Sequence, residues 1–217
     1  MKNYVVIDLE MCNTYKSIMN QKMNYKQELI QIGAILLNEN YEQIDSFVTY
    51  VRPEFGTIDT FIKELTGISK EDTQNAPCSR DALEAFSAWL PKDATIITWS
   101  KNDEKQIQNE LHRKHFDIPK LRETFGNWID CQQLFASKMN TTKKYKLSEA
   151  LPIADIYYDY GAHDALIDAK NTAKLFAKIQ LNEEFTLSPY FISATPKNAF
   201  TTSPFTYRNE YESCFTY

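Results

Sequence analysis

The stretch Val5-Val6-Ile7-Asp8-Leu9-Glu10 decides the interpretation of this chain, because an apolar run ends there in two carboxylates two residues apart. In a β-strand, residues i and i+2 project from the same face. Asp8 and Glu10 should therefore leave the end of a buried strand together. Two like charges at that spacing repel unless a cation lies between them. The stretch predicts a site for a hard divalent metal ion with oxygen ligands, and the alternative is an ordinary surface strand.

The rest of the chain predicts a mixed sheet flanked by helices. Three strands come first with short links, which favours an antiparallel meander, and helices then alternate with two further strands. A proline at position 152 should end the helix before it. Strands are expected over residues 4–7, 28–37, 44–51, 94–98 and 128–131, and helices over residues 57–65, 80–90, 103–114, 132–139, 147–151 and 164–181.

The composition changes after about residue 184, which divides the chain into two parts. Residues 1–184 are expected to form one domain of ordinary size. Residues 185–217 are rich in Ser, Thr, Pro, Phe and Tyr without a period, and we expect a tail that has no core of its own. Two alternatives stay open for this tail, since it either docks on the domain through its aromatic side chains or is disordered.

Bulk properties exclude several classes of protein. The 217 residues contain no apolar run of 18 residues, so no membrane span is expected, and the N-terminus does not resemble a secretion signal. The four widely spaced cysteines favour reduced thiols in a cytoplasmic protein. The net charge of −5 is unlike that of a general nucleic-acid binder, so any such contact needs local basic patches and bound cations.

Two further acids and a histidine occur at the ends of predicted elements. Asp103 begins a helix after the strand at 94–98, where the alternative role is a helix cap. Asp168 is expected in the second turn of a helix, among apolar neighbours, and a buried carboxylate needs a counter-charge. His163 is five residues earlier, which on one helix is a rotation of roughly 140°, so His163 should precede that helix. His112 and His115, near the end of a polar helix, are expected on the surface.

This constellation resembles the DEDDh, or DnaQ-like, family of 3′→5′ exonucleases over about residues 3–179. The turn at residues 65–68 and the short strand at residues 129–131 also resemble family elements. Met11 stands where the family usually has Thr or Ala, and the loop at residues 13–26 is longer than in its smallest members. The resemblance implies an α/β, ribonuclease-H-like fold with a mixed five-stranded sheet. The motifs that carry it are Asp8-x-Glu10, Asp103 after Trp99, and His163-x-Ala165-x-x-Asp168.

The family mechanism implies roles for these residues. Two Mg²⁺ or Mn²⁺ ions would bracket the scissile phosphate. Asp8 would bridge both ions, and Glu10 would bind one ion and touch the 3′ end. Asp103 would act partly through water, Asp168 would complete the shell of the first ion, and His163 would be the general base.

Recognition of a 3′ end requires apolar wedges and stacking surfaces for bases, together with cations for phosphates. Core packing is the alternative for the apolar members, and solvated surface is the alternative for the lysines in residues 16–26 and 138–146. Besides Glu10 and His163, the family pattern points to Leu9, Met11, Ile68, Trp99 and Asn102.

We therefore expect a metal-dependent 3′→5′ exonuclease that releases nucleoside 5′-monophosphates from single-stranded ends. Similarity to stand-alone members such as histone-mRNA exonucleases favours RNA slightly over DNA. Several members are homodimers, so the resemblance also allows a homodimer. Two alternatives are a non-catalytic nucleic-acid-binding or protein-binding module on the same fold, and a proofreading subunit of a replication assembly.

Overall fold

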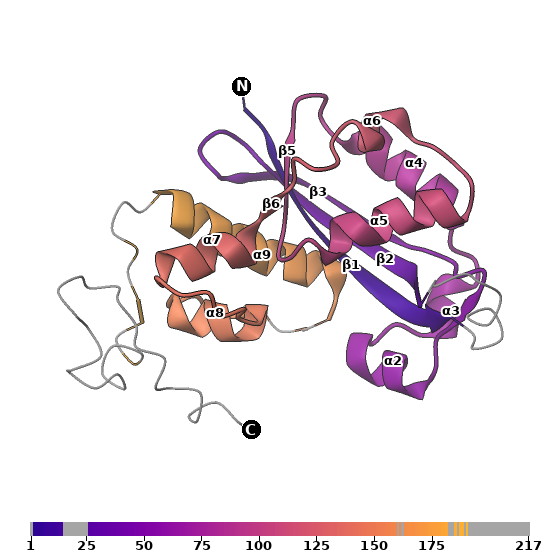
Figure 1. Ribbon diagram of the computed structural model, residues 1–217. Coiled ribbons are helices and arrows are strands. Elements are labelled where there is room, and N and C mark those ends of the chain that lie inside the picture. Colours follow the sequence, from indigo (N-terminus) through magenta and orange to yellow (C-terminus); the bar gives the residue numbers. More distant parts are fainter. Residues whose placement is uncertain are drawn as a thin grey trace.

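A mixed β-sheet lies at the centre of the molecule, with helices against both of its faces (Figure 1). The computed structural model describes residues 2–14, 26–159, 161, 163–181, 185, 187, 188 and 190. The strands are β1 (Tyr4–Thr14), β2 (Gln27–Leu37), β3 (Gln43–Tyr50), β4 (Gly56–Thr57), β5 (Thr95–Thr98) and β6 (Ile129–Asp130). The helices are α2 (Thr60–Thr66), α3 (Lys70–Thr73), α4 (Ser79–Trp89), α5 (Asn102–Arg113), α6 (Pro119–Arg122), α7 (Cys131–Lys138), α8 (Leu147–Ile153) and α9 (Ala165–Leu181).

The strand order is β3-β2-β1-β5-β6. β1 and β2 pair antiparallel, as do β2 and β3, which confirms the predicted meander. β5 runs parallel to β1, and β6 runs parallel to β5. The two-residue strand β4 pairs with the end of β1 and adds a sixth strand to the five expected. The predicted class, a mixed α/β sheet with flanking helices, is therefore confirmed.

Successive side chains of β1 point to opposite faces of the sheet, so alternate residues belong to two different hydrophobic clusters. Val5, Ile7 and Leu9 join the cluster beneath α4 and α5. Tyr4 and Val6 join the cluster formed with α7, α8 and α9. Because Asp8 continues the second set and Glu10 follows at the same spacing, both carboxylates lie on the face that α9 covers.

Helix α9 approaches the sheet most closely at Gly33, the β2 residue that pairs with Asp8. A Cβ atom at Gly33 would lie 2.2 Å from the carbonyl carbon of Ala165 and 2.2 Å from the nitrogen of Leu166. Only glycine leaves room for the backbone of the first turn of α9 at this point. The contact places Asp168, the fourth residue of α9, beside the carboxylates of β1.

Several local features differ from the sequence prediction. The first strand was expected to end at Ile7, but β1 continues to Thr14 because its pairing with β2 and β4 extends that far, so Asp8 and Glu10 lie within the strand and not at its end.

Helix α8 continues through Pro152 to Ile153, because a proline near the end of a short helix removes only one backbone hydrogen bond. Asp168 lies in the first turn of α9 rather than the second, since that helix begins at Ala165. The four-residue helices α3 and α6 were not expected, and such short elements carry too few residues to show a period.

Packing continues beyond residue 184. Phe185 is 2% exposed and its ring lies 5.9 Å, centroid to centroid, from that of Phe135. Leu187 is buried in the same cluster, and the Ser188 amide donates to the Ile153 carbonyl at 2.8 Å. The start of the predicted tail therefore docks on α7 and α8. Most of residues 185–217 lie outside the described residues, as do residues 16–25 of the predicted lysine segment.

Replacement of Gly33 by alanine should lower the free energy of unfolding by about 3 kcal/mol, the upper end of the usual range for overpacking, because the new methyl group meets backbone atoms of α9. Chemical denaturation measures this change. Gly126→Ala is the matched control, since it makes the same change in the unfolded chain at a position with open space. Its positive φ of 83° should cost only about 1 kcal/mol. If Gly33→Ala and Gly126→Ala lowered the free energy of unfolding equally, the close approach of α9 to β2 would not be what requires glycine at residue 33.

Candidate active site

Four acidic side chains from three elements meet beside the central strand β1, just past the end of β5. Asp8 and Glu10 come from β1, Asp103 is the second residue of α5, and Asp168 is in the first turn of α9. β5 runs parallel to β1, and Thr98 at its end pairs with Ile7. The chain therefore enters α5 beside the two acids of β1, which brings Asp103 to them. Asp103 and Asp168 are each less than 10% exposed, as is Glu10.

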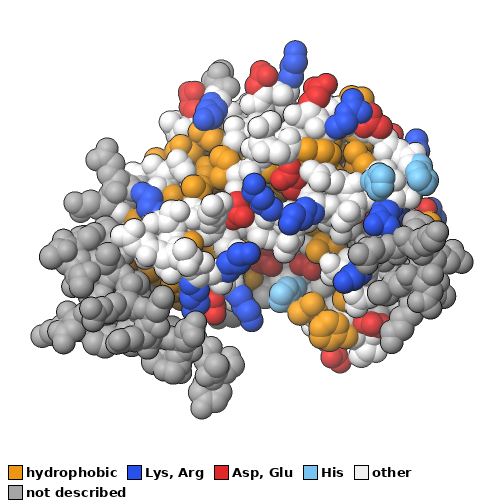
Figure 2. All heavy atoms as spheres, viewed as in Figure 1, with side chains coloured by type: hydrophobic (Ala, Val, Ile, Leu, Met, Phe, Trp, Pro, Cys, Tyr) orange, Lys and Arg blue, Asp and Glu red, His pale blue; other side chains and the backbone are white. Residues whose placement is uncertain are grey.

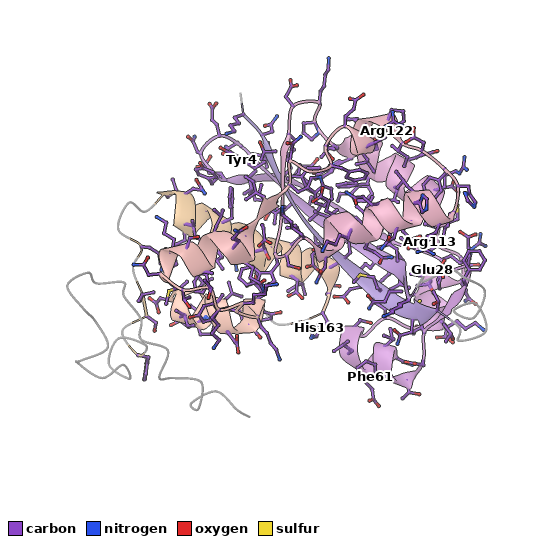
Figure 3. All side chains as sticks on the ribbon, in the orientation of Figure 1. Tyr4, Glu28, Phe61, Arg113, Arg122 and His163 are labelled. Carbon is purple, nitrogen blue, oxygen red and sulfur yellow. The ribbon has the colours of Figure 1, made fainter. Side chains whose placement is uncertain are left out.

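His163 joins these acids from the loop that precedes α9, as the sequence predicted. Its side chain is exposed, and its backbone adopts a left-handed conformation with a φ of 65°. Ligand atoms of Glu10, His163 and Asp168 all lie within 4.8 Å of one another. These three residues therefore lie together, and the charges of Asp103, Asp168 and Glu10 all act on Asp8. His163, labelled in Figure 3, is on the solvent side of the group.

Hydrogen bonds fix two of the carboxylates. The Thr98 hydroxyl and the Leu9 backbone amide donate to Asp103. The Tyr158 hydroxyl donates to Oδ1 of Asp168 at 2.5 Å, and the His163 backbone amide donates to Oδ2 of the same side chain at 3.1 Å. Asp168 is therefore held at both of its oxygens by the loop that carries His163.

The first turn of α9 is capped by two side chains. Asp164 Oδ1 accepts hydrogen bonds from the amides of Leu166 at 3.0 Å and Ile167 at 3.1 Å. Gln31, which pairs with Glu10 in the sheet, accepts from the amide of Ala165 at 3.0 Å. Its own amide donates to Asp164 at 3.2 Å. These contacts satisfy amides that a helix N-terminus otherwise leaves unpaired, and they fix where α9 begins relative to Glu10.

The crowded acids hold protons more tightly than isolated carboxylates do. Burial, followed by the charges of Asp168 and Asp103, raises the pKa of Glu10 to about 8. Burial also raises the pKa of Asp103 to about 7, against the lowering effect of its hydrogen bond from Thr98. The pKa of Asp8 lies well above its ordinary value because of burial and the neighbouring carboxylates. Without a cation, the site therefore stays partly protonated near neutral pH.

This donor set fits a hard divalent cation. Carboxylate oxygens are the ligands that Mg²⁺ and Mn²⁺ prefer, and the same four side chains carry the charge repulsion that such an ion would relieve. Asp8, Glu10, Asp103 and Asp168 would hold it.

The predicted substrate residues occupy different environments. Leu9 is 4% exposed and Ile68 is 3% exposed, so core packing accounts for most of both side chains. Met11 and Trp99 are half-buried, and Asn102 is exposed at the start of α5. The Trp99 ring lies 6.5 Å from that of Phe135, centroid to centroid, at the edge of the core.

Several residues near the site escaped sequence reasoning. Thr98 and Tyr158 contact acids five and ten residues further along the chain, and Gln31 contacts residues more than 130 positions away. None of these pairs has a spacing that a helix or strand period would signal. Phe61 on α2 is 63% exposed, which is unusual for a phenylalanine and invisible in a periodic pattern. Asp164 carried a recognisable signal, because an acid directly before a helix is a common N-cap.

The metal-free protein should lose stability as the pH rises from about 5 to about 9. The pKa values of Glu10 and Asp103 in the folded chain lie above their ordinary values of 4.5 and 3.8, so folding favours the protonated forms. The free energy by which these protonated carboxyls stabilise the folded chain is fully present below the ordinary pKa values. It is lost as the pH passes the folded-state pKa values of about 7 to 8. Melting temperatures in EDTA measure it, and added Mg²⁺ or Mn²⁺ should reverse the trend.

The double substitution Glu10→Gln with Asp103→Asn is the matching control, because it should flatten this dependence. Glu123→Gln on the surface should leave it unchanged. A metal-free wild-type protein that melts at the same temperature throughout this range would contradict the electrostatic description of the site.

Comparison with known proteins agrees with this geometry. A family model described as "Exonuclease" matches residues 5–176, which is more than half of the chain. ERI1 exoribonuclease 2 of Danio rerio is 29% identical over 195 residues, which cover 79% of this chain and 34% of that protein. The human protein of the same name is 30% identical over 185 residues, covering 73% of this chain and 26% of that protein. The chain thus spans between a quarter and a third of the length of these relatives.

Solved structures show the same fold. The nuclease domain of 3′hExo, described as a DEDDh family member bound to rAMP, has a TM-score of 0.71 at 22% identity, covering 86% of this chain and 96% of that one. Cell-death related nuclease 4 has a TM-score of 0.69 at 20% identity, covering 85% of this chain and 66% of that one. At such identities the likeness concerns the fold. Membership rests on the family model, and by that match the chain belongs to the exonuclease family, as its acidic motifs predicted.

Proposed function

We propose that this chain is a metal-dependent 3′→5′ exonuclease that hydrolyses phosphodiester bonds at the 3′ end of single-stranded nucleic acid and releases nucleoside 5′-monophosphates. The observation that carries this proposal is the convergence of Asp8, Glu10, Asp103, Asp168 and His163 beside the central strand of the sheet, in a chain of the exonuclease family. The names of the relatives in zebrafish, frog and human, which are exoribonucleases, favour RNA slightly over DNA.

The chain's own residues divide the chemical work. Two bound Mg²⁺ or Mn²⁺ ions would neutralise charge on the phosphate and act as Lewis acids. The four carboxylates would hold these two ions in place. His163 accepts the proton of the attacking water at a ring nitrogen, which its exposure and its position beside Glu10 and Asp168 allow. A ring nitrogen of His163 also lies within 4.8 Å of the carboxylate oxygens of Glu10 and Asp168, so His163 has a second candidate role as a metal ligand. Metal affinity of a His163 variant separates the role of general base from that of ligand.

An apolar surface on α2 supports recognition of the terminal bases. Ile62 of α2 shares a buried cluster with Cys12, two residues beyond Glu10. The outer side of α2 exposes Phe61 and Leu65, and Figure 3 shows Phe61 on this helix close to His163 in the view. An exposed aromatic ring offers a stacking surface for an unpaired base. Trp99, which is half-buried at the start of the segment that leads to Asp103, offers a second ring.

Lysines beside the site supply contacts for the phosphate backbone. Lys143, Lys144 and Lys146 are exposed before α8, and Lys101 is exposed before α5. Figure 2 shows basic side chains gathered over α7, α8 and the start of α5, next to the acidic site. The carbonyls of Trp99 and Tyr145 both accept hydrogen bonds from Gln132, which ties these two lysine-bearing segments together. A chain of net charge −5 thus still presents a local basic face.

Location, oligomeric state and the rival functions also need tests. Within the described residues, no helix has both the length and the apolar character needed to cross a bilayer. A cytoplasmic location and a homodimer remain predictions, which cell fractionation and sedimentation would test. The rival functions, a non-catalytic binding module and a proofreading subunit, are distinguished by turnover and by the size of the native assembly.

The purified chain should shorten 5′-labelled RNA and DNA oligonucleotides one nucleotide at a time in Mg²⁺ or Mn²⁺, because the carboxylates need a bound cation to receive a phosphate. EDTA should abolish the reaction, and nucleoside 5′-monophosphates should appear on chromatography. Metal binding without turnover would support the binding module instead. A ladder that persists in EDTA would contradict the proposal.

His163→Ala should lower kcat by about 10²–10⁴-fold, the usual contribution of a general base. His112→Ala, at an exposed position on α5, is the control and should leave kcat unchanged. Mn²⁺ affinity measured by calorimetry then separates the two roles of His163. Unchanged affinity supports a general base, whereas a marked loss assigns the imidazole to the metal.

Phe61→Ala should raise KM for a single-stranded oligonucleotide about tenfold with little change in kcat, since stacking on an aromatic side chain contributes about 1–3 kcal/mol per base. Steady-state kinetics measures both constants. Leu181→Ala is the matched control, because Leu181 is exposed to the same degree, 62% against 63%, at the end of α9. An unchanged KM for Phe61→Ala would remove this residue from the substrate surface.

A further inference from the structure

The carboxylate of Asp168 receives two hydrogen bonds from one loop. The Tyr158 hydroxyl reaches Oδ1 at 2.5 Å, and the backbone amide of His163 reaches Oδ2 at 3.1 Å. A carboxylate has about four lone-pair sites over its two oxygens. Each oxygen of Asp168 therefore keeps acceptor capacity for a cation after both donors are satisfied.

The second donor matters because an aspartate carboxylate turns easily. The χ2 torsion of aspartate is broad and roughly two-fold rather than confined to narrow staggered wells. A single donor on one oxygen leaves this rotation partly free. With a donor on each oxygen, the plane of the Asp168 carboxylate is fixed relative to Asp8 and Glu10.

The loop that supplies both donors is itself fastened to α9. The Asp159 amide donates to Oδ1 of Asn171 at 3.2 Å. The Asp159 carboxylate accepts from Lys174 at 2.7 Å and lies 3.4 Å from the ammonium group of Lys170. The Tyr158 ring packs against the core cluster formed with α7, α8 and α9. The packing of the Tyr158 ring therefore positions its hydroxyl to donate to Asp168.

From these contacts we infer that Tyr158 is a positioning residue of the metal site, whose hydroxyl fixes the Asp168 carboxylate in the orientation that binds a divalent cation. This inference rests on the proposed metal-dependent function. Second-sphere hydrogen bonds of this kind typically change metal affinity by about 10–100-fold when removed. The opposite arrangement, in which the hydroxyl competes with the cation for Oδ1, predicts an effect of opposite sign.

Tyr158→Phe tests the inference, because it removes only the hydroxyl and keeps the packed ring. Calorimetric titration with Mn²⁺, in the absence of nucleic acid, should show about a tenfold loss of affinity. The melting temperature of the metal-free variant should stay close to that of the wild type. Tyr157→Phe is the matched control: it removes a hydroxyl from the adjacent residue, which is 92% exposed, and should leave Mn²⁺ affinity unchanged.

A second variant separates positioning of the carboxylate from loosening of the loop. Lys174→Ala removes an anchor of the loop and leaves the Tyr158 hydroxyl in place, so Mn²⁺ affinity should change by less than in Tyr158→Phe. Unchanged or increased affinity in Tyr158→Phe would overturn the inference, as would an equal loss in Lys174→Ala. If the wild-type protein bound no Mn²⁺, the proposed function would fall as well, whereas normal wild-type binding and turnover would confine the failure to Tyr158.

Discussion

The close approach of α9 to β2 at Gly33 is the constraint on which the site depends. Gly33 pairs with Asp8, and the backbone of Ala165 and Leu166 occupies the space that any side chain at residue 33 would need. Three residues further along α9, Asp168 therefore faces the acids of β1. Any larger residue at this position would move the helix outward and separate the Asp168 carboxylate from the other three.

This geometry concentrates negative charge where the fold offers little solvent to disperse it. Burial is the first cause of the raised pKa values of Asp8, Glu10 and Asp103, and mutual repulsion adds to burial. The supporting hydrogen bonds come from Thr98 and from the loop that carries Tyr158. An arrangement that disfavours ionised carboxylates in the free protein is the arrangement that a divalent cation would stabilise, so electrostatic strain and metal affinity share one physical origin.

The residues of the candidate site that could be predicted are those that lie next to a recognisable strand or the start of a helix. Asp8 and Glu10 follow an apolar run within β1, Asp103 lies at the start of a helix, and His163 precedes one, and each signal involves only a few neighbouring residues. Tyr158 and Phe61 could not be found in this way. Tyr158 acts through one hydrogen bond to a residue ten positions away, and Phe61 is notable only because its ring is exposed.

By itself, the sequence determined the order of strands and helices apart from the short elements β4, α3 and α6, the acids that could bind a metal ion, and the family to which the chain belongs. These features follow from periodicity, capping and the spacing of carboxylates, which are local properties of the chain. Only the tertiary structure decided that Leu9 and Ile68 are core residues, that Phe185 packs on the domain, and that Tyr158 holds Asp168. Those outcomes depend on which surfaces meet in space, and contact between residues distant in sequence leaves no mark in a local pattern.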